Sequence, residues 1–109
     1  MRNDQLDTEN AVTVFAGLSH ETRFRAFLFL IGAGSKGMVQ SDLAARLSVP
    51  PQTLSFHLKE MSLAGLVSRE KNGTFIIYKI NPDTLKRITG FFILQNSTVK
   101  AKKRIKGIK

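Results

Sequence analysis

The sequence contains no cysteine and no tryptophan, and it has one tyrosine and three prolines among its 109 residues. Without cysteine, the chain forms neither a disulfide nor a thiolate metal site. No apolar run reaches about 18 residues, so no membrane-spanning helix is expected. The opening stretch, residues 1–5, is polar and lacks the apolar segment of a signal peptide. We therefore expect the chain to be cytoplasmic.

Acidic residues are also scarce, with eight Asp and Glu against 17 Lys and Arg, which gives a formal net charge of +9. Six cations lie in residues 100–109, which contain no acid, and subtracting six from nine leaves +3 on residues 1–99. This division predicts one folded domain over residues 1–98 and a flexible basic tail over residues 99–109. A basic balance favours polyanionic partners, with nucleic acid ahead of an anionic membrane surface.

Apolar residues recur with helical spacing in the first third of the chain. A short helix is expected over residues 10–18, and Ser19 is a plausible N-cap for a second helix. In that second helix, four apolar side chains fall at i, i+3, i+4 and i+7, which predicts one buried stripe. The stripe consists of Phe24, Phe27, Leu28 and Ile31. Three glycines between residues 32 and 37 then end the helix.

Residues 40–64 have the spacing of a helix-turn-helix. A helix of two turns is predicted over residues 40–47, and a tight connection follows at residues 48–50. A longer helix is predicted over residues 51–64, because Pro51 suits the first helical position and Gly65 suits the stop. At about 100° per residue, its core side carries Leu54, Leu58 and Met61. The opposite side, which faces solvent, carries Gln52, Ser55, Phe56, Lys59 and Leu63.

After Gly65 the apolar period changes from that of a helix to that of a strand. Residues 66–71 and 74–80 flank Asn72-Gly73, a dipeptide that favours a two-residue hairpin turn. With this turn, the cross-strand pairs are Lys71 with Thr74, Arg69 with Ile76 and Val67 with Tyr78. The hairpin tip then presents Arg69, Lys71 and Asn72 outward.

A last helix is predicted from Pro82, with Asn81 as its N-cap. Its apolar face carries Leu85, Ile88 and Phe92, with Ile93 as a candidate fourth member, and we expect the helix to end near residues 95–97. Together, the elements predict a mainly α protein with a small β-hairpin (α+β). The architecture is a winged helix-turn-helix of about five helices and a two-stranded wing.

The solvent side of helix 51–64 carries side chains of the types that read DNA. Gln52 can pair bidentately with adenine, Ser55 can bond base edges or phosphate, and Lys59 can reach phosphate or guanine. The exposed aromatic Phe56 suits contact with a thymine methyl group. On the wing that follows, Arg69 and Lys71 are candidates for phosphate binding. For this helix taken alone, the alternative interpretation is a polar face that contacts only solvent.

Three segments of the sequence resemble the ArsR/SmtB-type winged-helix repressors. They are the stretch LSHETRFR at residues 18–25, the DLA at 42–44 with TLSFHLKEM at 53–61, and the AGLV at 64–67 followed by Arg69, Gly73 and Tyr78. The resemblance covers roughly residues 11–92. It implies a homodimer that packs through the first and last helices, residues 10–18 and 82–96, and binds a pseudo-palindromic operator in double-stranded DNA as a repressor. It also implies base contacts from Gln52, Thr53, Ser55, Phe56 and Lys59.

The chain departs from the family at the positions that bind metals. Many members use a Cys-x-Cys pair where this sequence has Val39 and Ser41, and others place Asp and His on the last helix, which here offers Asp83 but no His. A third subgroup has cysteines where residues 94–98 stand. We therefore expect none of the family's usual metal sites and no cofactor. A carboxylate-rich metal site between subunits stays open as an alternative, and so does the identity of any inducer.

The two histidines complete the candidate list. His20 is expected at the surface or at a helix cap, and His57 as a structural histidine bonded to backbone. Neither has a nucleophile or carboxylate at a suggestive spacing, so we expect no catalytic site and no enzyme. Two alternatives to a sequence-specific regulator remain open. One is a non-specific architectural nucleic-acid-binding protein that relies on the tail, and the other is a protein-interaction adaptor.

Overall fold

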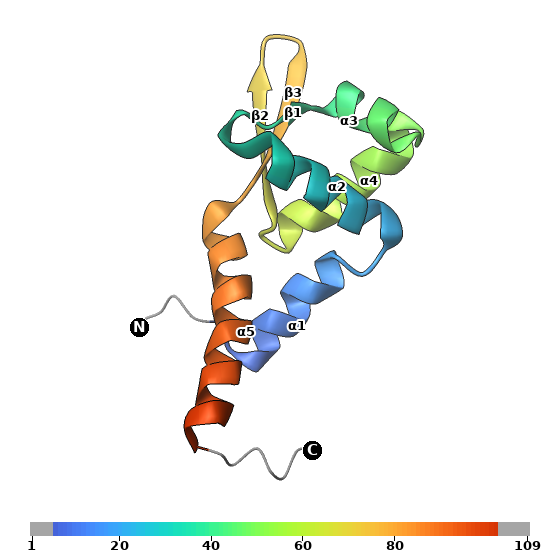
Figure 1. The fold of residues 1–109 in the computed structure, drawn as a ribbon. Coiled ribbons are helices and arrows are strands. Elements are labelled where there is room, and N and C mark those ends of the chain that lie inside the picture. The colour runs from blue at the N-terminus through green and yellow to red at the C-terminus, as the bar shows by residue number, and fades with distance from the viewer. Residues whose placement is uncertain (1–5, 103–109) are drawn as a thin grey trace.

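The part of the chain that the structure describes forms five helices and a small antiparallel sheet, which lies at the end of the molecule opposite the tip of the last helix (Figure 1). The structure is a computed structural model and describes residues 6–102. The helices are α1 (Thr8–Gly17), α2 (Glu21–Ala33), α3 (Gln40–Leu47), α4 (Pro51–Leu63) and α5 (Pro82–Lys102), with a short 3-10 turn at Gly34–Lys36. The strands are β1 (Met38–Val39), β2 (Val67–Asn72) and β3 (Phe75–Ile80). The predicted winged helix-turn-helix is confirmed.

The core lies where α2, α3 and α4 meet. Seven large side chains there are fully buried. Leu54, Leu58 and Met61 are among them, so the inner side of α4 is the one predicted from its angular pattern. The full set is Leu30, Leu43, Leu47, Leu54, Leu58, Met61 and Leu66.

The stripe predicted for α2 is wrong in three of its four members. Phe27 is buried, but Phe24, Leu28 and Ile31 are exposed, and Ala26 and Leu30 face the core instead. The reason is that α2 is apolar on two adjacent sides, and periodicity alone does not say which side the rest of the chain covers. Phe27 lies at the edge that the two sides share.

The sheet has three strands in the order β1-β3-β2, so the sequence analysis missed one strand. β1 pairs with β3 through Met38 with Tyr78 and Val39 with Ile77. Its two residues are too short to give a periodic signal. They complete the outer edge of β3 and tie the hairpin to the start of α3.

The predicted hairpin register is also wrong, by two residues. Arg69 pairs with Tyr78, Lys71 with Ile76 and Asn72 with Phe75, so the turn is Gly73-Thr74 and not Asn72-Gly73. Of the two turn residues, only Gly73 has a positive φ, 66°, which fits a hairpin turn with glycine at its first central position. Because the shift is by two residues, every side chain keeps its predicted face.

The last helix begins as predicted but extends further. The Asn81 side-chain oxygen accepts from the backbone N–H of Asp83 at 3.1 Å, which confirms the cap. The helix ends at Lys102 and not near residues 95–97. The polar residues 95–98 contain neither glycine nor proline, so nothing in them stops a helix. α5 therefore includes residues 99–102, and the rest of the predicted tail, residues 103–109, lies outside the described residues.

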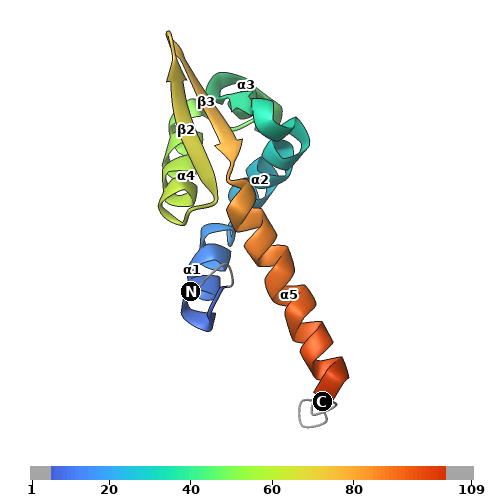
Figure 2. The same cartoon turned by 90° about the vertical axis from the view of Figure 1, so that its left-hand side faces the viewer.

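Figure 2 shows α5 leaving the sheet and extending away from α4 and the hairpin. Its first turn is anchored, because the hydroxyl of buried Thr84 donates to the carbonyl of Gly65 at 2.6 Å. Over the described part of the chain, no helix is long and apolar enough to cross a membrane.

Gly37 is the residue that tolerates a side chain least. Its φ is 71°, and a Cβ there would collide with the Tyr78 carbonyl oxygen and lie 2.6 Å from the Lys79 side chain. We expect Gly37→Ala to lower the free energy of unfolding by about 2 kcal/mol, measured by urea denaturation. Gly32→Ala in α2 is the control. A Cβ there meets no described atom within 4 Å, so the change should raise stability by up to about 1 kcal/mol. Equal stabilities of the two variants would contradict this account.

Candidate nucleic-acid interface

The outer side of α4 is open to solvent along its whole length. The five residues predicted to contact bases, Gln52, Thr53, Ser55, Phe56 and Lys59, are all exposed. Phe56 is 57% exposed, which is unusual for an aromatic side chain. α4 starts at Pro51, after Pro50 in extended conformation, and the backbone N–H of Leu54 closes the first turn on the Pro50 carbonyl at 3.0 Å.

A tight turn sets α4 against α3. Ser48 ends α3 with a φ of 56°, in the left-handed region. The N–H of Ser48 donates to the Ala45 carbonyl at 3.2 Å, and that of Val49 donates to the Ala44 carbonyl at 3.1 Å. Leu47 and Leu54, on either side of this turn, are both buried. The turn and the shared core therefore fix how α4 projects from the molecule.

A groove of about 310 Å³ separates α4 from β2. Ser55 and Lys59 line it from the helix, and Arg69 lines it from the strand, so these three predicted site residues share one surface. Lys71 is exposed two residues further along β2 and, by strand alternation, lies on the same face of the hairpin as Arg69. The groove also contains Ser62 and Ser68, which were not predicted as site residues. Ser62 lies only about 20° round the helix from Ser55, so the angular pattern could have indicated it, whereas Ser68 alternates with the basic residues along β2.

The acidic residue of the hairpin is turned away from this surface. Glu70 pairs with Lys79 at 2.9 Å, on the face opposite Arg69 and Lys71. Because the carboxylate is occupied there, it does not neutralise the two cations. The groove face of the hairpin is therefore positive.

Behind Phe56, a cluster of side chains joins α2 to α4. His57 is only 6% exposed, and its Nδ1 accepts a hydrogen bond from Nε of Arg23 at 3.0 Å. The backbone partner predicted for His57 is wrong, because its partner is the Arg23 side chain. No role was predicted for Arg23, although this residue lies within the stretch LSHETRFR.

His20 completes the cluster. Its ring centroid lies 4.3 Å from that of His57, and its Nδ1 accepts from the N–H of Thr22 at 3.1 Å. His20 is therefore the N-cap of α2, which confirms its capping role. Ser19 was the predicted cap, but its hydroxyl donates to the Ala16 carbonyl instead, at 2.8 Å.

The surroundings of His57 keep it neutral. Burial lowers the pKa of His57 below its usual value of 6.5, and the charges of His20 and Arg23 lower it further. Because Nδ1 accepts from Arg23, the single proton of the neutral ring lies on Nε2. Within residues 6–102, no three His, Asp or Glu side chains are grouped so that they could hold a metal ion.

Comparisons with known proteins place the chain in a family. A helix-turn-helix domain profile matches residues 18–70. An uncharacterized HTH-type transcriptional regulator of Methanocaldococcus jannaschii is 32% identical over 80 residues, which are 73% of this chain and 88% of that protein. The structure of an ArsR-like transcriptional regulator from Rhodococcus sp. RHA1 is 31% identical, with a TM-score of 0.70, over 93% of this chain and 91% of that one.

The chain belongs to the ArsR-like family of winged helix-turn-helix transcriptional regulators. The prediction of a DNA-binding transcriptional regulator, and not an enzyme, is confirmed at this level. A more distant structure supports the fold of this ArsR-like regulator. It is the homodimeric winged helix-turn-helix DNA-binding domain of a possible ArsR-family regulator from Mycobacterium bovis. It is 19% identical, with a TM-score of 0.62, over 87% of this chain and 83% of that one.

The lowered pKa of His57 predicts a loss of stability in mild acid. The unfolded chain titrates this histidine near 6.5 and binds the proton first. The free energy of unfolding should therefore fall as the pH drops from 6.5 through the lowered pKa, by at most about 1.4 kcal/mol per pH unit. Urea denaturation between pH 7.5 and 5.5 measures this slope. His57→Gln keeps an oxygen acceptor for Arg23 but does not titrate, so its slope should be shallower. Identical slopes would show that another group is responsible.

Proposed function

We propose that this ArsR-like regulator is a repressor that binds a pseudo-palindromic operator as a homodimer. The observation that carries the proposal is the exposed polar side of α4 beside the positive face of the hairpin. A helix of this width fits the major groove, and a hairpin at its side can reach the adjacent backbone. A dimer bound over a promoter would block transcription by occupying the DNA.

The proposed contacts divide by chemistry. Gln52 and Thr53, in the first turn of α4, would meet base edges through their amide and hydroxyl groups, and Ser55 would do so one turn along the groove side. Phe56 would pack on a thymine methyl group. Lys59 carries a charge that suits phosphate or guanine.

Arg69 and Lys71 on the hairpin would bind phosphates and release counterions. They would thus add affinity that depends on salt and not on sequence. Because Glu70 pairs with Lys79 on the opposite face of the hairpin, both charges are available for this role. In this proposal, α4 provides sequence specificity, and the hairpin provides affinity that does not depend on sequence.

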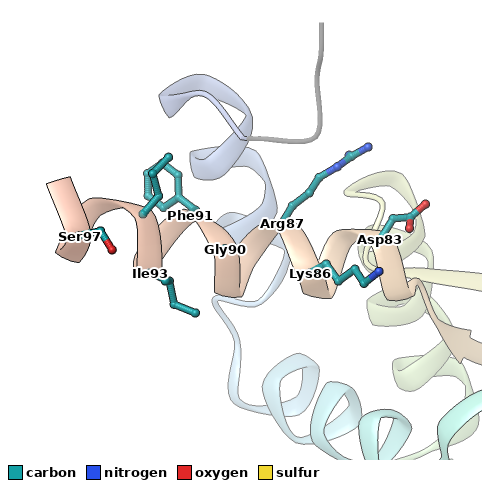
Figure 3. Close-up of a pocket in the computed structure, with 8 residues that line it drawn as sticks. Asp83, Lys86, Arg87, Gly90, Phe91, Ile93 and Ser97 are labelled. Atoms are coloured by element: carbon teal, nitrogen blue, oxygen red, sulfur yellow. The ribbon is translucent and has the colours of Figure 1, made fainter.

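The proposed dimer uses α1 and α5. A groove of about 590 Å³ runs along α5, and all its lining residues belong to that one helix, so this side is open to a partner (Figure 3). Ile93 in this groove is 65% exposed, and Val12 on α1 is similarly exposed. Gly90 sits mid-helix in the same groove without a described neighbour near its Cβ position, which suits the close approach of another helix. A two-fold axis through this surface would pair two recognition helices on one operator.

The assignment of α4 is tested by changing Gln52 and Ser55 to Ala together. We expect the variant to lose its preference for the operator over random DNA, because each bidentate base contact contributes about 1–3 kcal/mol of discrimination. Competition gel shifts on the upstream promoter region measure the preference.

The matched control replaces the tail cations Lys103, Arg104, Lys106 and Lys109 by Gln. This variant should bind all sequences more weakly, with a smaller salt slope, and keep its operator preference. If it lost nearly all binding, the chain would be an architectural protein. If the wild-type chain selected no sequence from a random pool, the adaptor alternative would be favoured.

The dimer surface is tested by Ile93→Glu. A carboxylate on this exposed position should cost the monomer little stability but should shift the chain to monomers, because it would be buried without a partner between two α5 helices. Sedimentation equilibrium measures the assembly, and operator affinity should fall with it. Gln95→Glu is the control, since Gln95 is exposed and lies about 160° round α5 from Ile93. A fully dimeric Ile93→Glu variant would exclude this face.

A further inference from the structure

Arg23 contacts three residues on two other helices at once. It lies on α2, and its Nε donates to Nδ1 of His57 on α4 at 3.0 Å. Its Nη1 donates to the carbonyl of Ala16 on α1 at 3.4 Å. Its guanidinium carbon lies 5.9 Å from the centroid of the Phe56 ring, within the range of a cation–π contact. The residue is thus partly enclosed while its charge stays beside an exposed aromatic ring.

Phe56 has few other restraints. It is 57% exposed, and its ring meets His57 edge to face at a centroid distance of 5.4 Å. His57 is held in turn by Arg23 and by the ring of His20. Arg23 therefore restrains the Phe56 ring in two ways: directly, through its guanidinium, and indirectly, through His57. Without Arg23, the Phe56 ring would be free to change rotamer in solvent.

We propose that Arg23 is a positioning residue for base recognition, which holds the Phe56 ring in the orientation that contacts a thymine methyl group. This inference rests on the proposed function, since it takes Phe56 to meet DNA. Arg23 would contribute no base contact itself. Its hydrogen bond to His57 fixes the guanidinium plane, and the fixed guanidinium then limits where the ring can lie.

The experiment measures thymine recognition one position at a time. Operator duplexes are prepared in which each thymine in turn is replaced by uracil, which removes only the methyl group. Wild-type protein should prefer thymine by about fourfold at one position in each half-site, the effect of burying one methyl group. Phe56→Ala should abolish that preference.

Arg23→Gln should reduce the same preference to nearly one at the same position. Adding Arg23→Gln to Phe56→Ala should change it no further, because the two act through one contact. Arg23→Lys keeps the charge but not the planar group, so it should restore only part of the preference. Circular dichroism spectra of each variant confirm folding, and Arg23→Lys keeps the test valid if Arg23→Gln unfolds.

Arg25→Ala is the matched control for loss of one positive charge from α2. Arg25 donates to the Leu47 carbonyl at 3.5 Å, and the thymine preference of this variant should equal that of the wild type. If Arg23→Gln kept the full thymine preference and lowered the salt slope by about one, Arg23 would be a phosphate contact and the inference would be overturned.

A further pair of outcomes distinguishes failure of the role proposed for Arg23 from failure of the proposed repressor function. If Phe56→Ala changed no thymine preference while wild-type binding stayed operator-specific, the role of Arg23 would be overturned and the repressor proposal would stand. If the wild-type protein distinguished no sequence at all, both would fail together.

Discussion

The burial of one side of α4 determines what its other side presents. Leu54, Leu58 and Met61 are fully enclosed by α2, α3 and the base of the hairpin, and each stabilises the fold by about 2 kcal/mol. A rotation of α4 about its axis would expose these side chains, so the helix has one orientation. For this reason, the exposed side chains face outward; they are Gln52, Thr53, Ser55, Phe56 and Lys59. The groove beside β2 follows from the same packing.

The sequence was sufficient to predict those parts of the fold in which a local pattern is compatible with only one arrangement. Proline at the start of α4, glycine after its end and a single apolar side gave the helix and its orientation together. α2 has apolar residues on two adjacent sides, so burial there depends on partners that are distant in the sequence, and Phe24, Leu28 and Ile31 were misassigned. β1 and the hairpin register depend on pairing between strands, and neither leaves a periodic trace in two to six residues.

The candidate site likewise has a part that could be predicted from the sequence and a part that could not. Exposed residues of α4 and the hairpin could be named from the sequence, because exposure follows from a helical angle or from strand alternation. The Arg23–His57 contact could not, since it joins residues 34 positions apart on different helices. Histidine burial was foreseen at the edge of the apolar arc of α4. Its partner was not, because a long arginine side chain can reach many acceptors and only the packing of α2 on α4 selects one.

The C-terminal end of α4 is where the proposed DNA-contacting surface meets the helices of the proposed dimer, α1 and α5. A Cβ on Gly17 of α1 would lie 2.7 Å from Cβ of Ala64, so α1 already touches this end with no space to move closer. On the other side, Thr84 of α5 donates to the carbonyl of Gly65. Arg23 adds a third connection, from α1 to the middle of α4. A displacement of either α1 or α5 would therefore strain contacts at α4 and not be absorbed by a flexible linker. In a dimer built on those two helices, the spacing of the two recognition helices would consequently be set by how α1 and α5 pack across the two-fold axis.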